Sequence, residues 1–161
     1  MDAQIVLQAS PLAKFMLGWK WAWAIAEILH YFGMSILMGA VLVMDIRLMG
    51  FFRRNISLHQ IHSLTPWALG AFLLNLITGV AFLSTRPRSY LENAAFDFKL
   101  VCLLLVGLNF LLFWFVVRAQ LAKLPDDGNT NLLAKSVGFS SILLWTLVIW
   151  GGRMIPVYGL G

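Results

Sequence analysis

The stretch "AEILHYFGMSILMGA", residues 26–40, is apolar enough to lie inside a bilayer, yet it contains Glu27 and His30. Three residues apart on a helix, these two side chains lie within one turn of each other. An ionisable side chain at membrane depth costs about 3 kcal/mol on insertion scales and usually serves a function. The stretch therefore predicts a membrane span and marks Glu27 and His30 as candidate site residues.

The composition of the whole chain indicates a membrane protein. Of its 161 residues, 60% are hydrophobic and 12% are charged, against about 45–50% and about 25% in soluble domains. A span needs about 20 mostly apolar residues, which leaves room for four spans and no separate soluble domain. We therefore expect an all-α integral membrane four-helix bundle, a single domain over residues 1–161. The net charge of +5 suits basic residues beside anionic lipid, so the expected partner is the lipid bilayer and not nucleic acid.

The four spans are predicted at about 19–49, 57–85, 99–121 and 136–158, with both termini on one side. The segment "SPLAKFML" (10–17) places Ser10 before Pro11, a helix start, and predicts a short N-terminal interfacial helix. The first 18 residues lack the short apolar core and small-residue cleavage site of a signal peptide. Pro66 predicts a kink in the second span. Basic residues divide equally between the two sides, which leaves the orientation open.

Polar residues of all four spans are predicted to converge in one zone. With the third span starting at Lys99, His30, Asn75 and Asn109 each fall ~15 Å from the side of the N-terminus, at ~1.5 Å per residue. Helical spacing puts Glu27 and His30 on one stripe of the first span and Trp145, Ile149 and Arg153 on one stripe of the fourth. We expect an inward-facing set of five residues: Glu27, His30, Asn75, Asn109 and Arg153. For the asparagines, ordinary hydrogen bonding between helices is the competing interpretation.

A second polar cluster is predicted at the opposite end of the bundle. Asp45 shares the inward stripe of the first span and is expected to pair with a basic residue from another segment, for instance Arg118 or Arg54. Arg47 points about 200° away from Asp45 and should have different partners. His59 and His62 lie one turn apart, as metal ligands do, although histidines at a surface are more often simply solvated. Cys102 lies in an apolar run and is expected to be a small buried hydrophobe.

Several segments resemble an uncharacterised bacterial family of short four-span membrane proteins. They are "AEILHYFGMSILMGAVLVMDIRLMG", "TPWALGAFLLNLITGVAFL", "NAAFDFKL", "GLNF" and "LLWTLVIWGGRMI", and the likeness covers nearly all of residues 22–155. The resemblance implies the four-span fold and the importance of positions such as Glu27, His30, Asp45, Lys99 and Arg153, and it implies no activity. A weaker similarity connects the chain with the copper-resistance-type four-span fold, whose first span also carries a histidine.

The first functional hypothesis is a haem b protein in electron transfer. Four-helix bundles build cofactor sites from inward-facing side chains, and a carboxylate that orients a histidine is a usual arrangement around an axial ligand. His30 would ligate the iron, Glu27 would orient it, and Met154 would be a possible second ligand. The cofactor-binding residues are predicted to be Glu27, His30, Asn75, Lys99, Asn109, Arg153 and Met154. His62, ~20 Å from His30 along the helices, is too far away to share one iron with it.

Two other hypotheses stay open. Copper handling would use His30 with Met34 and Met38, because thioethers select Cu(I), and His59 and His62 could form a separate metal site. A cofactor-free accessory subunit would use the polar zone only for assembly, and "SILMG" (35–39) offers a small-residue contact for a partner membrane subunit or a homo-oligomer. No motif of a hydrolytic enzyme occurs in the predicted core. The expected location is the bacterial inner membrane.

Overall fold

The computed structural model describes residues 3–125 and 128–158, with the side chains of Ala3 and His59 excepted. Its helices are α1 (Ala3–Gln8), α2 (Pro11–Gly18), α3 (Ala22–Leu48), α4 (Leu58–Thr85), α5 (Pro87–Leu91), α6 (Ala94–Leu112), α7 (Arg118–Leu121) and α8 (Leu132–Tyr158), with a π-helical turn η1 (Phe113–Val117) between α6 and α7. Four stretches are long and apolar enough to cross a membrane: Ala22–Leu48, Gln60–Thr85, Ala94–Leu121 and Leu132–Tyr158. The predicted all-α four-span bundle is confirmed.

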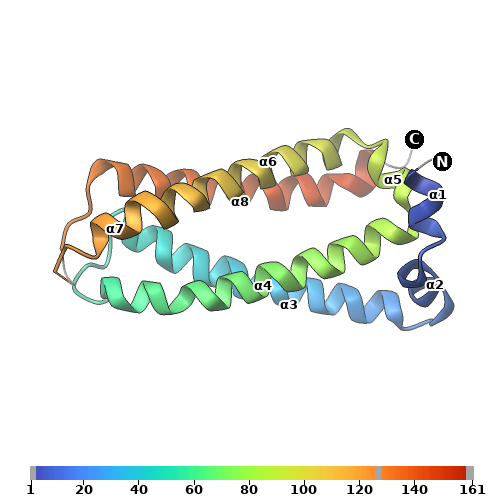
Figure 1. The fold of residues 1–161 in the computed structure, drawn as a ribbon, viewed down its shortest axis with the longest axis horizontal. Coiled ribbons are helices and arrows are strands. Elements are labelled where there is room, and N and C mark those ends of the chain that lie inside the picture. The colour runs from blue at the N-terminus through green and yellow to red at the C-terminus, as the bar shows by residue number, and fades with distance from the viewer. Residues whose placement is uncertain (1–2, 126–127, 159–161) are drawn as a thin grey trace.

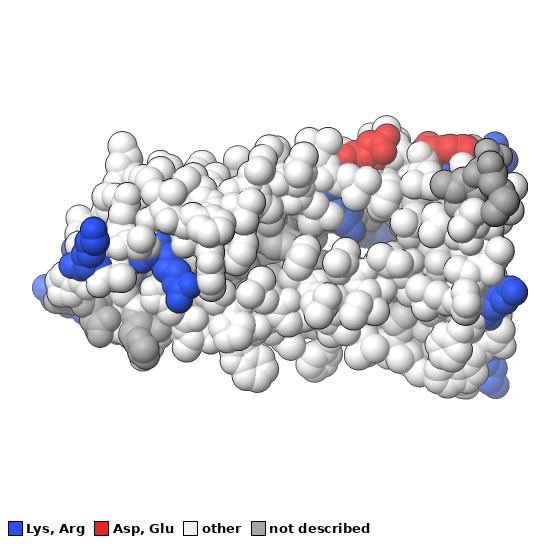
Figure 2. Space-filling model, viewed as in Figure 1, with Lys and Arg blue, Asp and Glu red and all other residues white. Residues whose placement is uncertain are grey.

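The four long helices form two antiparallel pairs (Figure 1). α3 packs along α4, α6 packs along α8, and the two pairs are joined mainly by α3 and α8. α1, α2, α5 and the C-terminal end of α8 lie at one end of the bundle, as predicted for termini on the same side. Charged side chains gather at the two ends, and a largely uncharged band lies between them (Figure 2). This distribution suits a chain that crosses a bilayer.

The N-terminal segment lies across the end of the bundle. Ser10 caps α2 by accepting a hydrogen bond from the Ala13 amide, as its position before Pro11 predicts. α1 was not predicted. It is attached to the end of α5, where Gln4 donates to Glu92 at 3.1 Å and Arg88 donates to the same carboxylate at 3.0 Å. Hydrogen bonds from Arg88 and Gln4 hold the pKa of Glu92 below its usual range.

Two spans begin earlier than predicted because asparagines cap them. Asn93 accepts a hydrogen bond from the Ala95 amide at 2.9 Å, so α6 begins at Ala94 instead of Lys99. The Asn93 side chain also donates to the Ile155 carbonyl at 2.9 Å and so ties α6 to α8. Asn131 accepts from the Ala134 amide, and α8 begins at Leu132 instead of residue 136. Asparagine favours such cap positions because its side chain satisfies the free amides of the first turn.

Small residues let the helices approach closely. A Cβ at Gly138 of α8 would lie 2.8 Å from the Asp45 carbonyl oxygen of α3. A Cβ at Gly33 of α3 would lie 3.1 Å from the Asn75 side chain of α4. Membrane helices pack by such close contacts because lipid gives them no hydrophobic drive to associate. Cys102 is buried in a central apolar cluster with Leu37 and Trp145, as predicted.

Arg47 is wholly buried and connects the two loops at the far end of the bundle. Its Nε donates to the Ile56 carbonyl at 2.7 Å, and its guanidinium also donates to the Gly128 carbonyl at 3.3 Å. Nearby, the Thr130 hydroxyl donates to the Leu48 carbonyl at 2.7 Å. The connection between α3 and α4 is thereby fixed to the connection that precedes α8.

Candidate functional site

His30 faces α4, where it meets a threonine. Its Nδ1 lies 2.7 Å from Thr78 Oγ1, and its ring packs edge-on against Phe82 at 5.6 Å between centroids. The Thr78 hydroxyl donates its own hydrogen to the Leu74 carbonyl at 2.8 Å, so toward His30 it acts as an acceptor. With the hydroxyl hydrogen directed to that carbonyl, Nδ1–H is the donor toward Thr78, and Nε2 of the neutral ring keeps its lone pair.

The expected hydrogen bond between Glu27 and His30 is absent from the described contacts, and the inward placement of Glu27 is wrong. Glu27 is exposed on the outer face of α3, and its described partner is the Tyr31 hydroxyl at 3.4 Å. Three residues along a helix correspond to a rotation of about 60° between side chains. That rotation turns His30 toward α4 and leaves Glu27 outside the bundle. Thr78 holds the imidazole instead.

Asn75 lies one turn before Thr78 and faces α3, as predicted. Its Nδ2 would lie 3.1 Å from a Cβ at Gly33, so the glycine makes room for the amide. Its Oδ1 is buried and has no hydrogen-bond partner among the described residues. A buried amide oxygen without a partner costs free energy. This site therefore still offers a hydrogen-bond acceptor.

Lys99 joins this group from α6. Its Nζ lies 3.5 Å from the position of a Cβ at Gly152 of α8, so its aliphatic chain runs over that glycine. It is half-buried and close enough to His30 to act on the imidazole electrostatically. In Figure 2, basic atoms lie at the bottom of a hollow between α4 and α6. The structure thus brings together four residues, which we name the His30 cluster: His30, Asn75, Thr78 and Lys99.

Asn109 does not belong to the His30 cluster, and its predicted depth is wrong. α6 begins at Ala94, so Asn109 lies 15 residues into the helix, about 22 Å from its start. There its Nδ2 donates to the Val137 carbonyl at 3.2 Å, and its Oδ1 accepts from the Ser140 hydroxyl at 2.9 Å. Asn109 therefore binds the first half of α8, as an interhelical contact does.

Asp45 faces inward, as predicted, and lines a cavity of about 170 Å³ between the four helices. The prediction that Asp45 pairs with a basic residue is wrong. Ser141 of α8 lines the same cavity, and Asp45 Oδ2 has no hydrogen-bond partner among the described residues. Arg118 is exposed and lies over the Trp114 ring at 4.2 Å, and Arg54 is exposed in the turn after α3. Arg47 bonds to loop carbonyls, so Asp45 and Arg47 have different partners, as predicted.

The remaining candidates lie apart from the His30 cluster. Arg153 is exposed, which contradicts its inward placement, because the stripe from Trp145 drifts by about 80° over eight residues. Met154 and Met34 are half-buried, and Met38 packs against the central apolar cluster. Among the residues that the structure describes, no three His, Cys, Asp or Glu side chains are grouped to hold a metal ion.

His62 of α4 lies far from His30. His62 packs beside Phe113 with ring centroids 6.5 Å apart. It precedes Thr78 by 16 residues, about 24 Å along α4. The predicted separation from His30 is therefore confirmed. The side chain of His59 lies outside the described residues.

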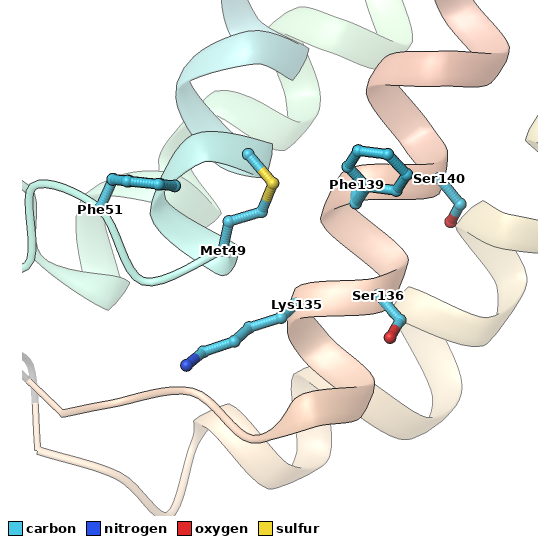
Figure 3. Close-up of a pocket in the computed structure, with 6 residues that line it drawn as sticks. All are labelled: Met49, Phe51, Lys135, Ser136, Phe139 and Ser140. Atoms are coloured by element: carbon cyan, nitrogen blue, oxygen red, sulfur yellow. The ribbon is translucent and has the colours of Figure 1, made fainter.

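A depression of about 560 Å³ lies at the far end of the bundle. Figure 3 shows Met49 and Phe51 of the turn after α3 on one side and Lys135 and Phe139 of α8 on the other. Ser140, at its margin, already donates to Asn109. The depression contains no buried polar side chain that needs a partner among its described lining residues. It is therefore a weaker candidate than the His30 cluster or the Asp45 cavity.

The sequence pattern did not identify Thr78 as the partner of His30, nor Ser141 as a residue that lines the cavity with Asp45. Both are common residues of membrane helices, where a hydroxyl usually bonds to a carbonyl of its own preceding turn. Thr78 makes that bond as well. The available signal was its spacing of three residues from Asn75, which puts both on one face of α4.

Comparison with known proteins identifies the family of the chain and the residues that match it. No curated protein and no solved structure matches the chain. A family model does match it, over residues 17–158, which includes α3, α4, α6 and α8 and therefore both candidate sites. The chain belongs to the family of unknown function DUF6644.

Proposed function

We propose that the protein binds haem b in the membrane and transfers electrons, with His30 as an axial ligand. The observation that carries the proposal is the hydrogen bond of 2.7 Å between His30 and Thr78. With Nδ1 as the donor in this bond, the Nε2 lone pair would be available to a metal. Histidine ligands are commonly held in this way by a hydrogen bond from the other ring nitrogen.

The surroundings of His30 suit a haem group. Phe82 packs against the imidazole edge and limits its rotation. Lys99 is half-buried nearby, forms no ion pair among the described residues, and would pair with a propionate through a charge-assisted contact. The hollow between α4 and α6 lies on the open side of the bundle (Figure 2). Haem would supply the one-electron chemistry, and the chain would supply the ligand, the counter-charge and the apolar walls.

The outer face of α3 supports a neighbouring subunit as the electron-transfer partner. Glu27, Tyr31, Ser35 and Gly39 recur every four residues and are all exposed. A Cβ at Gly39 would meet nothing within 4 Å, so another helix can approach closely there. We place the protein in the bacterial inner membrane beside a partner membrane subunit or a second copy. A Gly39→Leu variant should then be smaller than the wild type on size-exclusion chromatography in mild detergent; identical elution would contradict this contact.

Copper is the second candidate, supported by one observation. Met34 follows His30 by four residues, is half-buried, and belongs to neither the central apolar cluster nor its packed neighbours. An imidazole and a thioether one turn apart are ligands that Cu(I) accepts. Met38 is less suitable because it already packs against the central cluster.

Visible absorption spectra of the purified protein, oxidised and then reduced, test the proposal. We expect a Soret band that shifts on reduction, that is lost in His30→Ala, and that is retained in His62→Ala. The second variant is the matched control, because it removes another half-buried histidine of a span. If elemental analysis finds bound copper and the spectrum has no Soret band, the cofactor is copper and not haem. A His30→Ala protein with its full haem content would refute the site. If the wild type contains neither haem nor copper, the accessory-subunit hypothesis is the one that stays.

A further inference from the structure

The Asp45 cavity is distinct from the His30 cluster. It lies between α4 and α6, over α3 and α8, and its walls are mainly apolar. Its aromatic lining residues are Phe72, Phe110, Phe113 and Trp145. The volume is about 170 Å³, and an engineered apolar cavity of about 150 Å³ holds benzene. The space is therefore that of one six-membered ring.

The cavity reaches the outer surface of the bundle. Leu69 and Phe72 of α4 and Gly107 of α6 line it and are also exposed. The two helix pairs are joined mainly through α3 and α8, so the side between α4 and α6 is the looser one. Because both helices are long and apolar enough to span the membrane, a molecule that enters there comes from the lipid. The occupant must be soluble in the bilayer.

One polar atom in this cavity still needs a partner. Asp45 is 5% exposed, and its Oδ2 has no hydrogen-bond partner among the described residues. Ser141 of α8 also lines the cavity. Asn109, which also lines the cavity, has both of its amide atoms engaged with α8. A buried carboxyl oxygen without a partner is costly, so the occupant should bring a hydrogen-bond donor.

We propose that this cavity binds the ring of a lipid-soluble phenol, such as a membrane quinol, through a hydrogen bond from its hydroxyl to Asp45 Oδ2. The aromatic walls hold the flat ring, and its alkyl tail passes between α4 and α6 into the lipid. A plain acyl chain would fill the apolar space of the cavity and leave Asp45 Oδ2 without a hydrogen-bond donor. This inference goes beyond haem binding and does not depend on it, because it concerns a different site and is tested by binding alone.

Binding of two matched probes to the purified full-length protein in detergent tests the hydroxyl. 4-Decylphenol has the donor, and 4-decylanisole has the same ring and tail with the hydrogen replaced by a methyl group. We expect the phenol to bind about tenfold to a hundredfold more tightly, the range for a hydrogen bond to a buried carboxyl group. In Asp45→Leu this preference should disappear. Equal affinities in the wild type would overturn the proposal and leave water as the occupant of the cavity.

Two glycine variants test the location without touching Asp45. A Cβ at Gly107 or at Gly70 would meet nothing within 4 Å, so a side chain can start at either position without a clash at Cβ. Gly107 lines the cavity, and Gly70 does not. Gly107→Leu should weaken 4-decylphenol binding at least tenfold, and Gly70→Leu should leave it unchanged. Equal effects of the two variants would show that the phenol only partitions onto the apolar surface, which refutes the site.

A third probe distinguishes quinols from other phenols. Decylbenzoquinol carries a second hydroxyl on the opposite side of the same ring. Tighter binding than that of 4-decylphenol, lost in Gly107→Leu, would identify quinols as the ligand class. Affinity equal to that of the phenol would support the phenol site without selection for quinols. Failure of decylbenzoquinol to compete with 4-decylphenol would contradict a common site.

Discussion

At the scale of single residues, the environment of His30 depends on a side chain from another helix. Glu27 is the nearest carboxylate along the sequence, yet Thr78 of α4 holds the imidazole. A neutral hydroxyl orients the ring without the cost of a second charge at membrane depth. The arrangement therefore fixes the tautomer of His30 and leaves Glu27 to the outer surface.

Replacement of Thr78 tests its role as a positioning residue. Thr78→Val keeps the shape and removes the acceptor for His30 Nδ1, so haem affinity should fall about tenfold to a hundredfold, as for other partners of metal-bound histidines. Thr78→Ser keeps the hydroxyl and should retain the affinity. The haem affinities of both variants are measured by titrating the apoprotein with haem and recording the absorbance of the Soret band. Equal affinities of the Val and Ser variants would show that Thr78 acts only in packing.

Arg47 illustrates what residue spacing alone does not reveal. The sequence places it near the membrane surface beside other arginines, and its spacing from Asp45 correctly predicts different partners. The structure shows it wholly buried, with loop carbonyls as acceptors. Contacts between loops depend on tertiary packing, which the helical period of one span does not contain.

Arg47→Lys should destabilise the protein. Lysine cannot reproduce the planar set of donors that binds the Ile56 and Gly128 carbonyls. Loss of charged hydrogen bonds of this kind costs about 2 kcal/mol, and thermal unfolding in detergent should report a lower Tm. Arg53→Lys is the control, because Arg53 is exposed in the connection that follows α3. A Tm of the Arg47 variant equal to that of the control would contradict the buried role.

At the scale of elements, the existence of all four spans was predictable, and the starts of two of them were not. A long apolar run identifies a span even where the residue at which its helix begins or ends is not known. The capping residues Asn93 and Asn131 lie in polar segments that offer several possible starts. Setting the third span to begin at Lys99 placed Asn109 too close to the N-terminal side by five residues. The same correction brings Lys99 itself into the His30 cluster.

Gly138→Ala should weaken the contact between α3 and α8. The added Cβ would lie 2.8 Å from the Asp45 carbonyl oxygen and 3.1 Å from Leu48 Cβ, so the backbones must separate. Overpacking of this kind costs about 1–3 kcal/mol. Gly79→Ala is the matched control, because its Cβ would meet nothing within 4 Å and alanine favours a helix. In thermal unfolding, the Tm of Gly138→Ala should be lower than that of the wild type, and the Tm of Gly79→Ala should not. Equal shifts of the two Tm values would refute the close packing.

At the scale of the whole molecule, the two helix pairs meet at one main interface. α3 and α8 form that interface, while α4 and α6 face each other across the cavity and the hollow. The His30 cluster lies nearer the end that carries α1, α2 and α5, and Asn109 and Asp45 lie toward the other end. Both candidate sites therefore involve the same open side of the bundle, at different depths.

The arrangement predicts which exposed positions share a side of the membrane. Ser89 of α5 lies at the end that carries α1 and α2, whereas Asn55, before α4, and Lys123, after α7, lie at the opposite end. Cys102, the single cysteine, is buried and is first replaced by Ala. In intact cells, a membrane-impermeant maleimide should then label either Ser89→Cys alone or both Asn55→Cys and Lys123→Cys.

Either of these two results fixes the orientation that the equal numbers of basic residues leave open. Permeabilised cells supply the control, because all three cysteines should react there with similar yields. Labelling of Asn55→Cys without Lys123→Cys in intact cells would place the two loops on different sides. That result would contradict the contacts through which Arg47 binds the carbonyls of Ile56 and Gly128 together, and with them the four-span arrangement.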